Sequence, residues 1–414
     1  MGKRPWICLF LIVAANILLF AQLYHNIGVD DVFCILFGSM TILIIVGFIV
    51  LHFTGGADIY IYLVVSMLSC IGTVMIYRLD KEQGIRQIIW FFLGIVVMFI
   101  VKIASKYFKY WDNAWYVLLA AIFLSLAATQ MFGVTVGGAT NWIVIGNIRF
   151  QPSEAVKFLF VLFLACYHNK HEKLVKNKII NLLLPFAVCY VSVLFLVLQR
   201  EWGVSMLIIL IFFAVEYVYN EKRIFLFINA VFMSIFSYAG YNLMNHIKIR
   251  VDTWINPWAD ISGKGYQIAQ SLFAIFSGGL LGTGIGLGRP DIIPAAQTDF
   301  IFSAICEELG IFTGAGLLLL YLLFFLRGLK MTFSLKHIFS RCCVVGITSV
   351  FAIQSFIIIA GVTKFMPLTG ITLPFVSYGG SSMLVSFAIT GLLQSIRNID
   401  ELISNSELQN IQKA

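Results

Sequence analysis

The chain has 414 residues, of which 60% are hydrophobic and only 12% are charged. Soluble domains carry about a quarter charged residues, so this balance excludes a soluble globular protein and indicates a polytopic membrane protein. The formal net charge of +8 comes from basic residues dispersed among short loops. That dispersion favours contact with anionic lipid and argues against nucleic acid as a partner.

Helices are the predicted elements, because continuous apolar runs satisfy their backbone in lipid only as helices, whereas a barrel would show short alternating segments. A spanning helix needs roughly 20 mainly apolar residues. Twelve runs approach this length and predict an all-α, polytopic helical bundle. In chain order they cover residues 6–24, 34–52, 59–77, 87–105, 114–132, 155–168, 179–197, 203–219, 224–243, 300–326, 342–361 and 380–396.

The distribution of Lys and Arg predicts the orientation, because short cytoplasmic loops carry the excess of these residues. With the N-terminus inside, the cytoplasmic groups are Lys3 and Arg4, Lys106 and Lys109, Lys170/Lys173/Lys176/Lys178, Lys222 and Arg223, and Arg327/Lys330/Lys336/Arg341. Arg78, Lys81 and Arg86 fall on the other face and disagree. The sequence therefore predicts three substantial outer loops, 133–154, 244–299 and 362–379.

Each outer loop ends where a helix re-enters the membrane. A helix N-terminus offers unpaired N–H groups and the positive end of the helix dipole, so it attracts phosphate or carboxylate. An anionic head group bound at the outer face would fit all three starts, and ordinary helix capping is the alternative. The starts are Gln151-Pro152-Ser153-Glu154, Thr298-Asp299 and Ser377-Tyr378-Gly379-Gly380-Ser381-Ser382.

Basic side chains in or beside the outer loops run against the preference for cytoplasmic Lys and Arg, and they favour a negatively charged ligand. They are Arg149, Lys157, Arg200, Lys248, Arg250, Lys264, Arg289 and Lys364. Lys157 lies nearly one turn inside the membrane, three residues after Glu154 on a similar helix face. Two interpretations stay open for it: a structural ion pair with Glu154, or a cation that holds a lipid phosphate.

The longest outer loop contains one predicted helix. Residues 265–277 are amphipathic, as expected of a short helix in the membrane interface. Its polar side carries Gln267, Gln270 and Ser271, and its apolar side carries Leu272, Phe273 and Phe276.

Three carboxylates mark the end of this loop and the helix that follows. Asp299 stands at the lip of that helix, where an ionisable group is a functional-site hypothesis, although a helix N-cap is the alternative. Glu307 and Glu308 follow about two turns later. They could form a relay, a metal site or a structural hydrogen-bonding pair, and the sequence does not choose among these.

Spaced motifs along the chain resemble one family. They are Gly138-Ala139 with Trp142-Ile143, Phe150-Gln151-Pro152-Ser153-Glu154 with Lys157, Asn256-Pro257-Trp258, Gly265-Tyr266-Gln267 with Gln270-Ser271, Thr298-Asp299-Phe300-Ile301-Phe302, Glu307-Glu308-Leu309-Gly310, and Leu373-Pro374-Phe375-Val376-Ser377-Tyr378-Gly379-Gly380-Ser381-Ser382. Together they resemble the shape, elongation, division and sporulation (SEDS) family of RodA, FtsW and SpoVE. The likeness runs from residue 59 to residue 397 and includes all three outer loops in order.

The resemblance implies a ten-helix core that polymerises lipid II, an undecaprenyl-pyrophosphate-linked disaccharide peptide, on the outer face of the cytoplasmic membrane. It also implies a class B penicillin-binding protein as partner, and it places the family's essential aspartate at Asp299. Residues 58–397 would form this core, with loop 244–299 outside. Residues 1–57 would add two transmembrane helices, and 398–414 a cytoplasmic tail.

The chain departs from the family pattern at three places. Asn141 stands where the family usually has Arg, Arg200-Glu201-Trp202 where Pro-Asp-Leu is commoner, and Gln297 where His usually precedes the Thr-Asp pair. Arg200 is a candidate replacement for the cation missing at position 141.

The predicted mechanism is general-base glycosyl transfer by Asp299, with nearby Arg and Lys neutralising the pyrophosphate that leaves. A divalent cation, Mg²⁺ or Mn²⁺, could share that neutralisation, and no organic cofactor is expected. The predicted substrate-binding residues are Trp142, Gln151, Ser153, Glu154, Lys157, Arg200, Arg250, Tyr266, Gln267, Gln270, Ser271, Thr298, Glu307, Glu308, Lys364, Ser377, Tyr378, Gly379, Gly380, Ser381 and Ser382.

Two other classes of function remain as alternatives. A lipid II flippase would need polar residues at mid-bilayer depth, whereas here they gather on the predicted outer side. A non-catalytic scaffold for a penicillin-binding protein would tolerate replacement of the outer polar residues. The sequence does not distinguish among elongation, division and sporulation.

Overall fold

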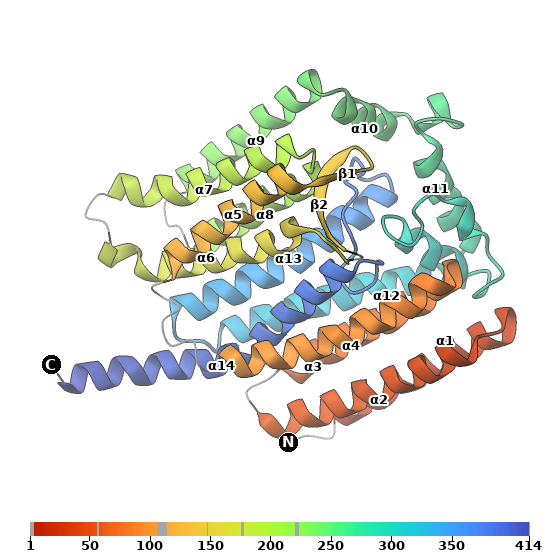
Figure 1. Ribbon diagram of the computed structural model, residues 1–414, viewed down its shortest axis with the longest axis horizontal. Coiled ribbons are helices and arrows are strands. Elements are labelled where there is room, and N and C mark those ends of the chain that lie inside the picture. The colour runs from red at the N-terminus through yellow and green to blue at the C-terminus, as the bar shows by residue number, and fades with distance from the viewer. Residues whose placement is uncertain are drawn as a thin grey trace. The chain divides into compact units, whose positions relative to one another are not determined.

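Helices make up nearly all of the regular structure (Figure 1). The computed structural model describes residues 4–55, 58–105, 114–146, 148–174, 178–219 and 223–413. Of the basic residues that predict the orientation, Lys3, Lys106, Lys109, Lys176 and Lys222 lie outside the described residues. The α-helices are α1 (Arg4–Ile27), α2 (Asp31–Thr54), α3 (Ile59–Leu79), α4 (Lys81–Ala104), α5 (Trp115–Phe132), α6 (Pro152–Leu174), α7 (Lys178–Leu198), α8 (Trp202–Tyr219), α9 (Ile224–Leu243), α10 (Asn245–Ile255), α11 (Tyr266–Gly278), α12 (Ile301–Thr332), α13 (Ile338–Val362) and α14 (Gly380–Lys413).

The twelve predicted apolar runs each coincide with a helix, so the all-α class is confirmed. In the described part of the chain, nine helices are long and apolar enough to cross a membrane. The other three predicted runs lie in α6, α7 and α14, and α7 carries a shorter apolar stretch, Leu183–Leu198. Charged or polar segments at the ends of α6 and α14 dilute their hydropathy.

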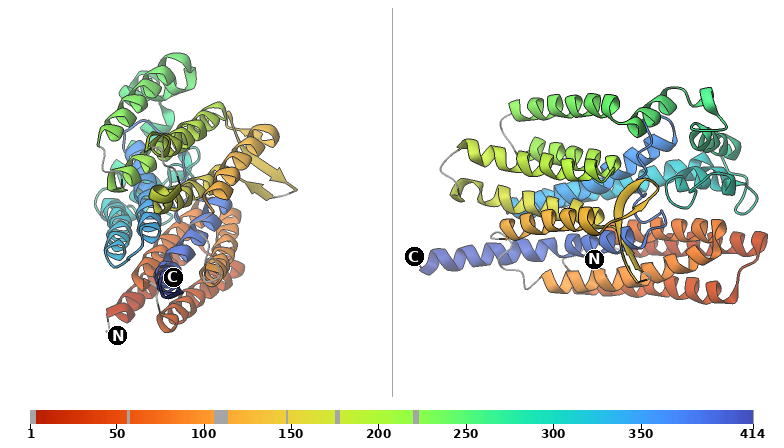
Figure 2. Two further views of the ribbon diagram at one scale, coloured as in Figure 1. Left: turned by 90° about the vertical axis from the view of Figure 1, so that its left-hand side faces the viewer. Right: turned by 45° about the horizontal axis from the view of Figure 1, so that its top comes forward.

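A small sheet that the sequence did not predict lies between α5 and α6. Its strands are β1 (Val134–Val136), β2 (Ala139–Ile145) and β3 (Ile148–Phe150), paired antiparallel in the order β1-β2-β3. Gly137 and Gly138 turn the chain between β1 and β2 with φ of 60° and 86°, values that glycine adopts without strain. Strand β2 contacts α5, and Figure 2 shows the sheet next to that helix.

The chain forms two compact units, each built from separate stretches of sequence. The first unit contains residues 1–95, 234–324 and 354–384, and the second contains 96–233, 325–353 and 385–414. The first unit therefore holds all of the predicted outer loops 244–299 and 362–379, whereas the second holds loop 133–154.

The predicted loop 244–299 contains more structure than expected. The interfacial helix predicted at 265–277 is present as α11 (Tyr266–Gly278). Helix α10 was not predicted. The loop also contains two 3₁₀ turns, Pro257–Asp260 and Pro290–Ile292. One face of α11 is buried in the first unit, while Phe273 and Phe276 are exposed on its other face.

Helix α12 is interrupted near its start. Gly310 has φ 83° and ψ 165°, which break the helical path between a short segment, 301–309, and the rest of the helix. Asp299 lies two residues before the short segment, so contacts that fix 301–309 also restrict the predicted catalytic residue.

Candidate active site

Asp299 lies in a tight turn that leads into α12. The three amides from Thr298 to Phe300 all donate to the carbonyl of Ala295, at 3.1 to 3.4 Å. Among the described residues, no backbone amide of α12 donates to the Asp299 carboxylate, as the amides of a capped helix would. The half-buried carboxylate therefore does not act as a helix N-cap, and it can face a ligand.

The connection between α13 and α14 packs against this turn. The Ser377 hydroxyl donates to the carbonyl of Thr298 at 2.5 Å and accepts from the amide of Leu373 at 2.8 Å. The Tyr378 amide donates to the carbonyl of Gln297 at 2.9 Å. Two of the three predicted outer loops therefore meet at Asp299, and hydrogen bonds from Ser377 and Tyr378 fix the backbone on its N-terminal side.

Arg250 of α10 approaches Asp299 from a third segment. Its Nη1 donates to the carbonyls of Leu368 and Thr369, at 3.1 and 2.8 Å. Its Nη2 and the Oδ2 of Asp299 each lie 3.5 Å from the position that a Cβ on Gly370 would take. Within the described part of the chain no direct ion pair joins the two groups. A guanidinium and a carboxylate therefore flank the space that a side chain at Gly370 would fill.

Burial is the main influence on the acidity of Asp299. Desolvation raises the pKa of this carboxyl, because burial disfavours its charged form. The nearby Thr298 side chain and the positive charge of Arg250 lower the pKa, and they offset part of the rise. A carboxylate with a raised pKa is a stronger base than an ordinary aspartate, as general-base catalysis requires.

Trp254 of α10 fixes the same connection at a second point. Its Nε1 donates to the carbonyl of Lys364 at 3.2 Å, where the backbone has φ 62°. The ammonium of Lys364 has no protein partner in the part of the chain that the structure describes. Helix α10 therefore fixes the backbone of residues 364–369 at both ends. The Lys364 ammonium in this stretch is available to a ligand.

The predicted binding residues of α11 divide into two kinds. Ser271 is buried and structural, since its hydroxyl bonds Ser303 at 2.6 Å and the carbonyl of Val362 at 2.8 Å. The Tyr266 hydroxyl donates to the carbonyl of Ile292 at 3.5 Å. Gln267 and Gln270 are half-buried without a side-chain partner among the described residues, so their amides are available to a ligand.

Glu307 and Glu308 are structural in this arrangement. The Oε1 of Glu307 accepts from the amide of Arg289 at 2.8 Å, and the Oε1 of Glu308 accepts from Nε of Arg78 at 2.9 Å. Of the three interpretations that the sequence left open, the hydrogen-bonding one fits these contacts.

The start of α14 also contributes to packing. Gly380 lies so close to Trp90 that a Cβ would meet the indole at 2.4 Å. The hydroxyls of Ser382 and Thr372 lie 3.0 Å apart, and the Oγ of Ser381 is buried without a partner among the described residues. At Gly379 a Cβ would make only ordinary contacts, the nearest at 3.5 Å to Ser382.

The predicted residues of loop 133–154 and α6 form a separate cluster in the second unit. Lys157 Nζ lies 3.0 Å from Glu154 Oε2, and both side chains are almost fully buried, at 1% and 4% exposure. This contact supports the structural ion pair over a cation exposed to lipid. Trp142 lies in β2 opposite Val134 and is half-buried.

Glu201 belongs to this cluster, and sequence reasoning did not place it among the site residues. Its Oε1 accepts from Nε2 of Gln151 at 2.6 Å, and the side chains of Asn141 and Ser153 also face its carboxyl. Burial raises the pKa of Glu201, and the nearby charge of Glu154 raises it further, while the polar side chains of Ser153, Asn141 and Gln151 lower it. The tripeptide Arg200-Glu201-Trp202, which departs from the family pattern, could have pointed to Glu201, but only Arg200 was considered as a site residue.

Arg200 lies beside the turn that precedes Asn141. It is exposed and directed toward the carbonyl of Gly138 at 3.4 Å, whereas the residue that faces Asn141 is Glu201. Arg200 thus contacts the turn that leads into the strand of Asn141, and its role as a replacement cation stays a prediction.

The described residues include no group of three or more His, Cys, Asp or Glu that could hold a metal ion. Mg²⁺ is commonly bound by one or two carboxylates together with substrate phosphates. Asp299 fits such a shared site only as one ligand, so a divalent cation would need phosphate oxygens and water for the rest.

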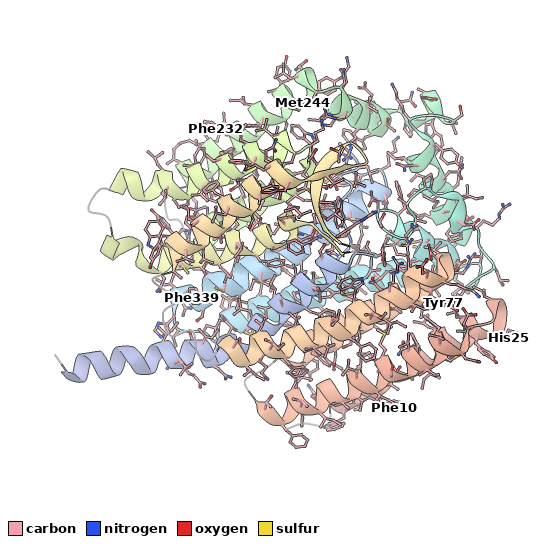
Figure 3. The ribbon with its side chains drawn as sticks, in the orientation of Figure 1. Phe10, His25, Tyr77, Phe232, Met244 and Phe339 are labelled. Carbon is pink, nitrogen blue, oxygen red and sulfur yellow. The ribbon has the colours of Figure 1, made fainter. Side chains whose placement is uncertain are left out.

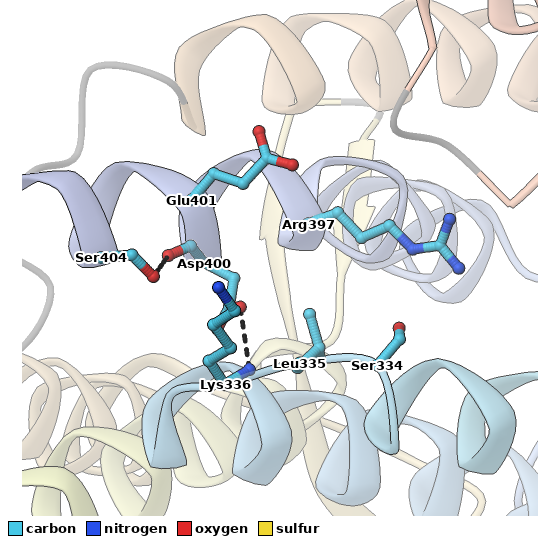
Figure 4. Close-up of a pocket in the computed structure, with 7 residues that line it drawn as sticks. All are labelled: Ser334, Leu335, Lys336, Arg397, Asp400, Glu401 and Ser404. Atoms are coloured by element: carbon cyan, nitrogen blue, oxygen red, sulfur yellow. Dashed lines mark hydrogen bonds between the residues drawn. The ribbon is translucent and has the colours of Figure 1, made fainter.

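One cavity, of about 580 Å³, lies in the second unit beside the connection from α12 to α13 (Figure 4). It is lined by Ser334, Leu335, Lys336, Arg397, Asp400, Glu401 and Ser404. The Asp400 carboxylate accepts the amides of Lys336 and His337, both at 2.9 Å, and so caps the start of α13. Of the two acids that line this cavity, Asp400 is already used for capping.

Fold and site together define a multi-pass membrane protein. The carboxylate of Asp299 and the guanidinium of Arg250 meet beside Gly370, where three segments of the chain come together. A family model described as cell cycle protein, for FtsW, RodA and SpoVE, matches residues 58–401. The chain belongs to this family.

Relatives and a solved structure agree with this assignment. Peptidoglycan glycosyltransferase RodA of Mycobacterium bovis is 32% identical over 357 residues, which cover 80% of this chain and 76% of the relative. Stage V sporulation protein E of Bacillus subtilis is 31% identical over 362 residues, with coverage of 82% and 96%. A structure solved for the "structural coordination of polymerization and crosslinking by a peptidoglycan synthase complex" matches with a TM-score of 0.71 at 25% identity, over 83% of this chain and 98% of that one.

Proposed function

We propose that this protein is a peptidoglycan glycosyltransferase that polymerises lipid II on the outer face of the cytoplasmic membrane. The observation that carries the proposal is the uncapped Asp299 carboxylate facing Nη2 of Arg250 across Gly370. Relatives named as peptidoglycan glycosyltransferases support the reaction class, and lipid II as the substrate is part of the proposal.

Asp299 is the general base in this proposal. It accepts the proton of the acceptor sugar's 4-hydroxyl while that oxygen attacks the anomeric carbon of the donor. The bond from the anomeric carbon to the pyrophosphate oxygen breaks, and undecaprenyl pyrophosphate leaves with the electron pair. General-base catalysis contributes roughly 10²- to 10⁴-fold to such a step.

Charge neutralisation supports the departure of the pyrophosphate. Arg250 uses Nη1 for the backbone and keeps Nη2 for a phosphate oxygen, and Lys364 offers a second cation from the same connection. Fixed positive groups stabilise charge that develops in the transition state. A divalent cation, Mg²⁺ or Mn²⁺, would add to this neutralisation when bound with the substrate.

The lipid bilayer and a class B penicillin-binding protein complete the proposed setting. Phe273 and Phe276 of α11 are exposed apolar groups that suit contact with lipid tails. A transpeptidase partner would crosslink the strands that this chain polymerises. The solved complex, which coordinates polymerisation and crosslinking, supports such a pairing.

The test uses the purified full-length chain, labelled lipid II and separation of the products by length on a gel. Asp299→Asn is expected to abolish polymer formation while the protein stays folded. Asp291→Asn is the matched control, since Asp291 is an exposed carboxylate of the same loop, and it should polymerise normally. Full activity of Asp299→Asn would refute the catalytic assignment, and lipid flipping without polymerisation in a parallel liposome assay would favour the flippase.

A further inference from the structure

The hairpin of α1 and α2 precedes the part of the chain that the family model matches, which begins at residue 58. Its turn nevertheless contacts the glycine-rich segment before Asp299. Nδ2 of Asn26 donates to the carbonyl of Ile285 at 2.7 Å. At Gly286, where φ is 83°, a Cβ would lie 2.4 Å from Cγ1 of Ile27, so the two residues are in close contact.

A second set of contacts fixes the turn of the hairpin to the end of α3. The Tyr77 hydroxyl donates to Oδ2 of Asp30 at 3.1 Å, and the Tyr77 and Phe33 rings stack with centroids 3.6 Å apart. In Figure 3, Tyr77 lies at the same end of the hairpin as His25. Because Arg78 follows Tyr77, the same end of α3 also reaches the glycine-rich segment: Nη2 of Arg78 donates to the carbonyl of Gly288 at 3.0 Å.

The segment held in this way, residues 279–289, forms hydrogen bonds with α12 on both sides of its break at Gly310. Its amides at Thr283 and Gly284 donate to the carbonyls of Glu307 and Glu308, both at 2.9 Å. Beyond the break, the amide of Ile311 donates to the carbonyl of Gly279 at 3.0 Å. The kink at Gly310 leaves these backbone amides and carbonyls without their partners inside the helix. In a membrane they therefore need hydrogen-bond partners elsewhere in the protein.

Side chains add to the same attachment. Arg78 bridges the two parts, since its Nε bonds Glu308 at 2.9 Å while its Nη2 bonds Gly288. The amide of Arg289 donates to Glu307 at 2.8 Å. Segment 279–289 therefore holds residues 301–309 in place by backbone and side-chain bonds, and Asp299 lies two residues before the part that is held.

We infer that the turn of the α1–α2 hairpin is a positioning element for Asp299. By pressing segment 279–289 onto residues 301–309, it limits the movement of the short helical segment that carries the base. Its effect on catalysis rests on the proposed function, whereas its effect on the segment does not. Asn26 and Ile27 are the residues through which the hairpin acts.

The test replaces the donor at Asn26 and measures the segment directly. Asn26→Asp keeps the shape of the side chain but sets a carboxylate against the carbonyl of Ile285. Hydrogen exchange of the Thr283 and Gly284 amides in the purified full-length protein is expected to quicken roughly two- to tenfold, the equivalent of one net hydrogen bond. With labelled lipid II, kcat should fall by a similar factor at unchanged KM, because Asp299 is displaced while the substrate contacts remain.

Asn16→Ala is the matched control. Asn16 lies on the same helix and bonds Thr41 at 2.8 Å inside the hairpin, away from the segment. This variant should leave both the exchange and kcat unchanged. Gly286→Ala is a second variant, in which the new methyl meets Ile27, and it should quicken the exchange more than Asn26→Asp does.

The outcomes separate the two claims. Unchanged exchange in both Asn26→Asp and Gly286→Ala overturns the attachment by the hairpin, whatever the activity. Quicker exchange with an unchanged kcat overturns the positioning of Asp299. If the wild-type chain forms no polymer, the proposed function fails, while the exchange measurement still decides whether the hairpin holds the segment.

Discussion

Gly370→Ala is the sharpest test of the site at Asp299. The new methyl would lie 3.5 Å from both Arg250 Nη2 and Asp299 Oδ2, which is ordinary contact, so the fold can accept it. At φ 71° the substitution costs about 1–2 kcal/mol in backbone strain. The methyl also takes the space in which a phosphate oxygen would meet the guanidinium. Loss of one hydrogen bond to a charged group costs about 1.5–3 kcal/mol, so kcat/KM should fall about ten- to a hundredfold.

The assay compares this variant with Gly137→Ala in lipid II polymerisation and in unfolding experiments in detergent. Gly137 has φ 60°, and no atom of the described residues lies within 4 Å of the position that its Cβ would take. Both variants should lose similar stability, and only Gly370→Ala should lose polymerisation. Equal activity of the two folded variants would show that no substrate group enters the space between Arg250 and Asp299.

Three further predictions concern charge. The acidic limb of the pH profile of kcat/KM reports the pKa of the free general base. Arg250→Gln should move this limb to higher pH, because it removes a charge that lowers the pKa of Asp299; an unmoved limb contradicts the assignment. Lys157→Met should cost about 3–5 kcal/mol, since it leaves the buried Glu154 charge unpaired. Glu201→Gln should be at least as stable as the wild type at neutral pH. The raised pKa of Glu201 makes wild-type stability fall as pH rises from the ordinary glutamate range toward the folded value, and Gln removes that loss.

The membrane helices were predictable because hydropathy is a local property. A run such as 59–77 has to be a helix in lipid whatever it packs against, and the structure confirms it as α3. Asp299 was predictable for a similar reason, since a carboxylate at the lip of an apolar run is costly unless it is used.

Other features depended on contacts between distant residues. Strands of three and seven residues in β1 and β2 carry little signal of their own, and pairing with each other makes them a sheet. The break at Gly310 is stable because segment 279–289 supplies its hydrogen-bond partners, which no local pattern near Gly310 reveals.

The sequence by itself determined that the chain crosses a membrane many times, where its helices lie, and which carboxylate and cations to consider. Only the tertiary structure decided that Arg250 lies beside Asp299 at Gly370, and that Glu307 and Glu308 hold a segment in place. The physical reason is that burial of apolar length acts on each helix alone, whereas the partner of a polar group is set by which segments the fold brings within about 3 Å of it.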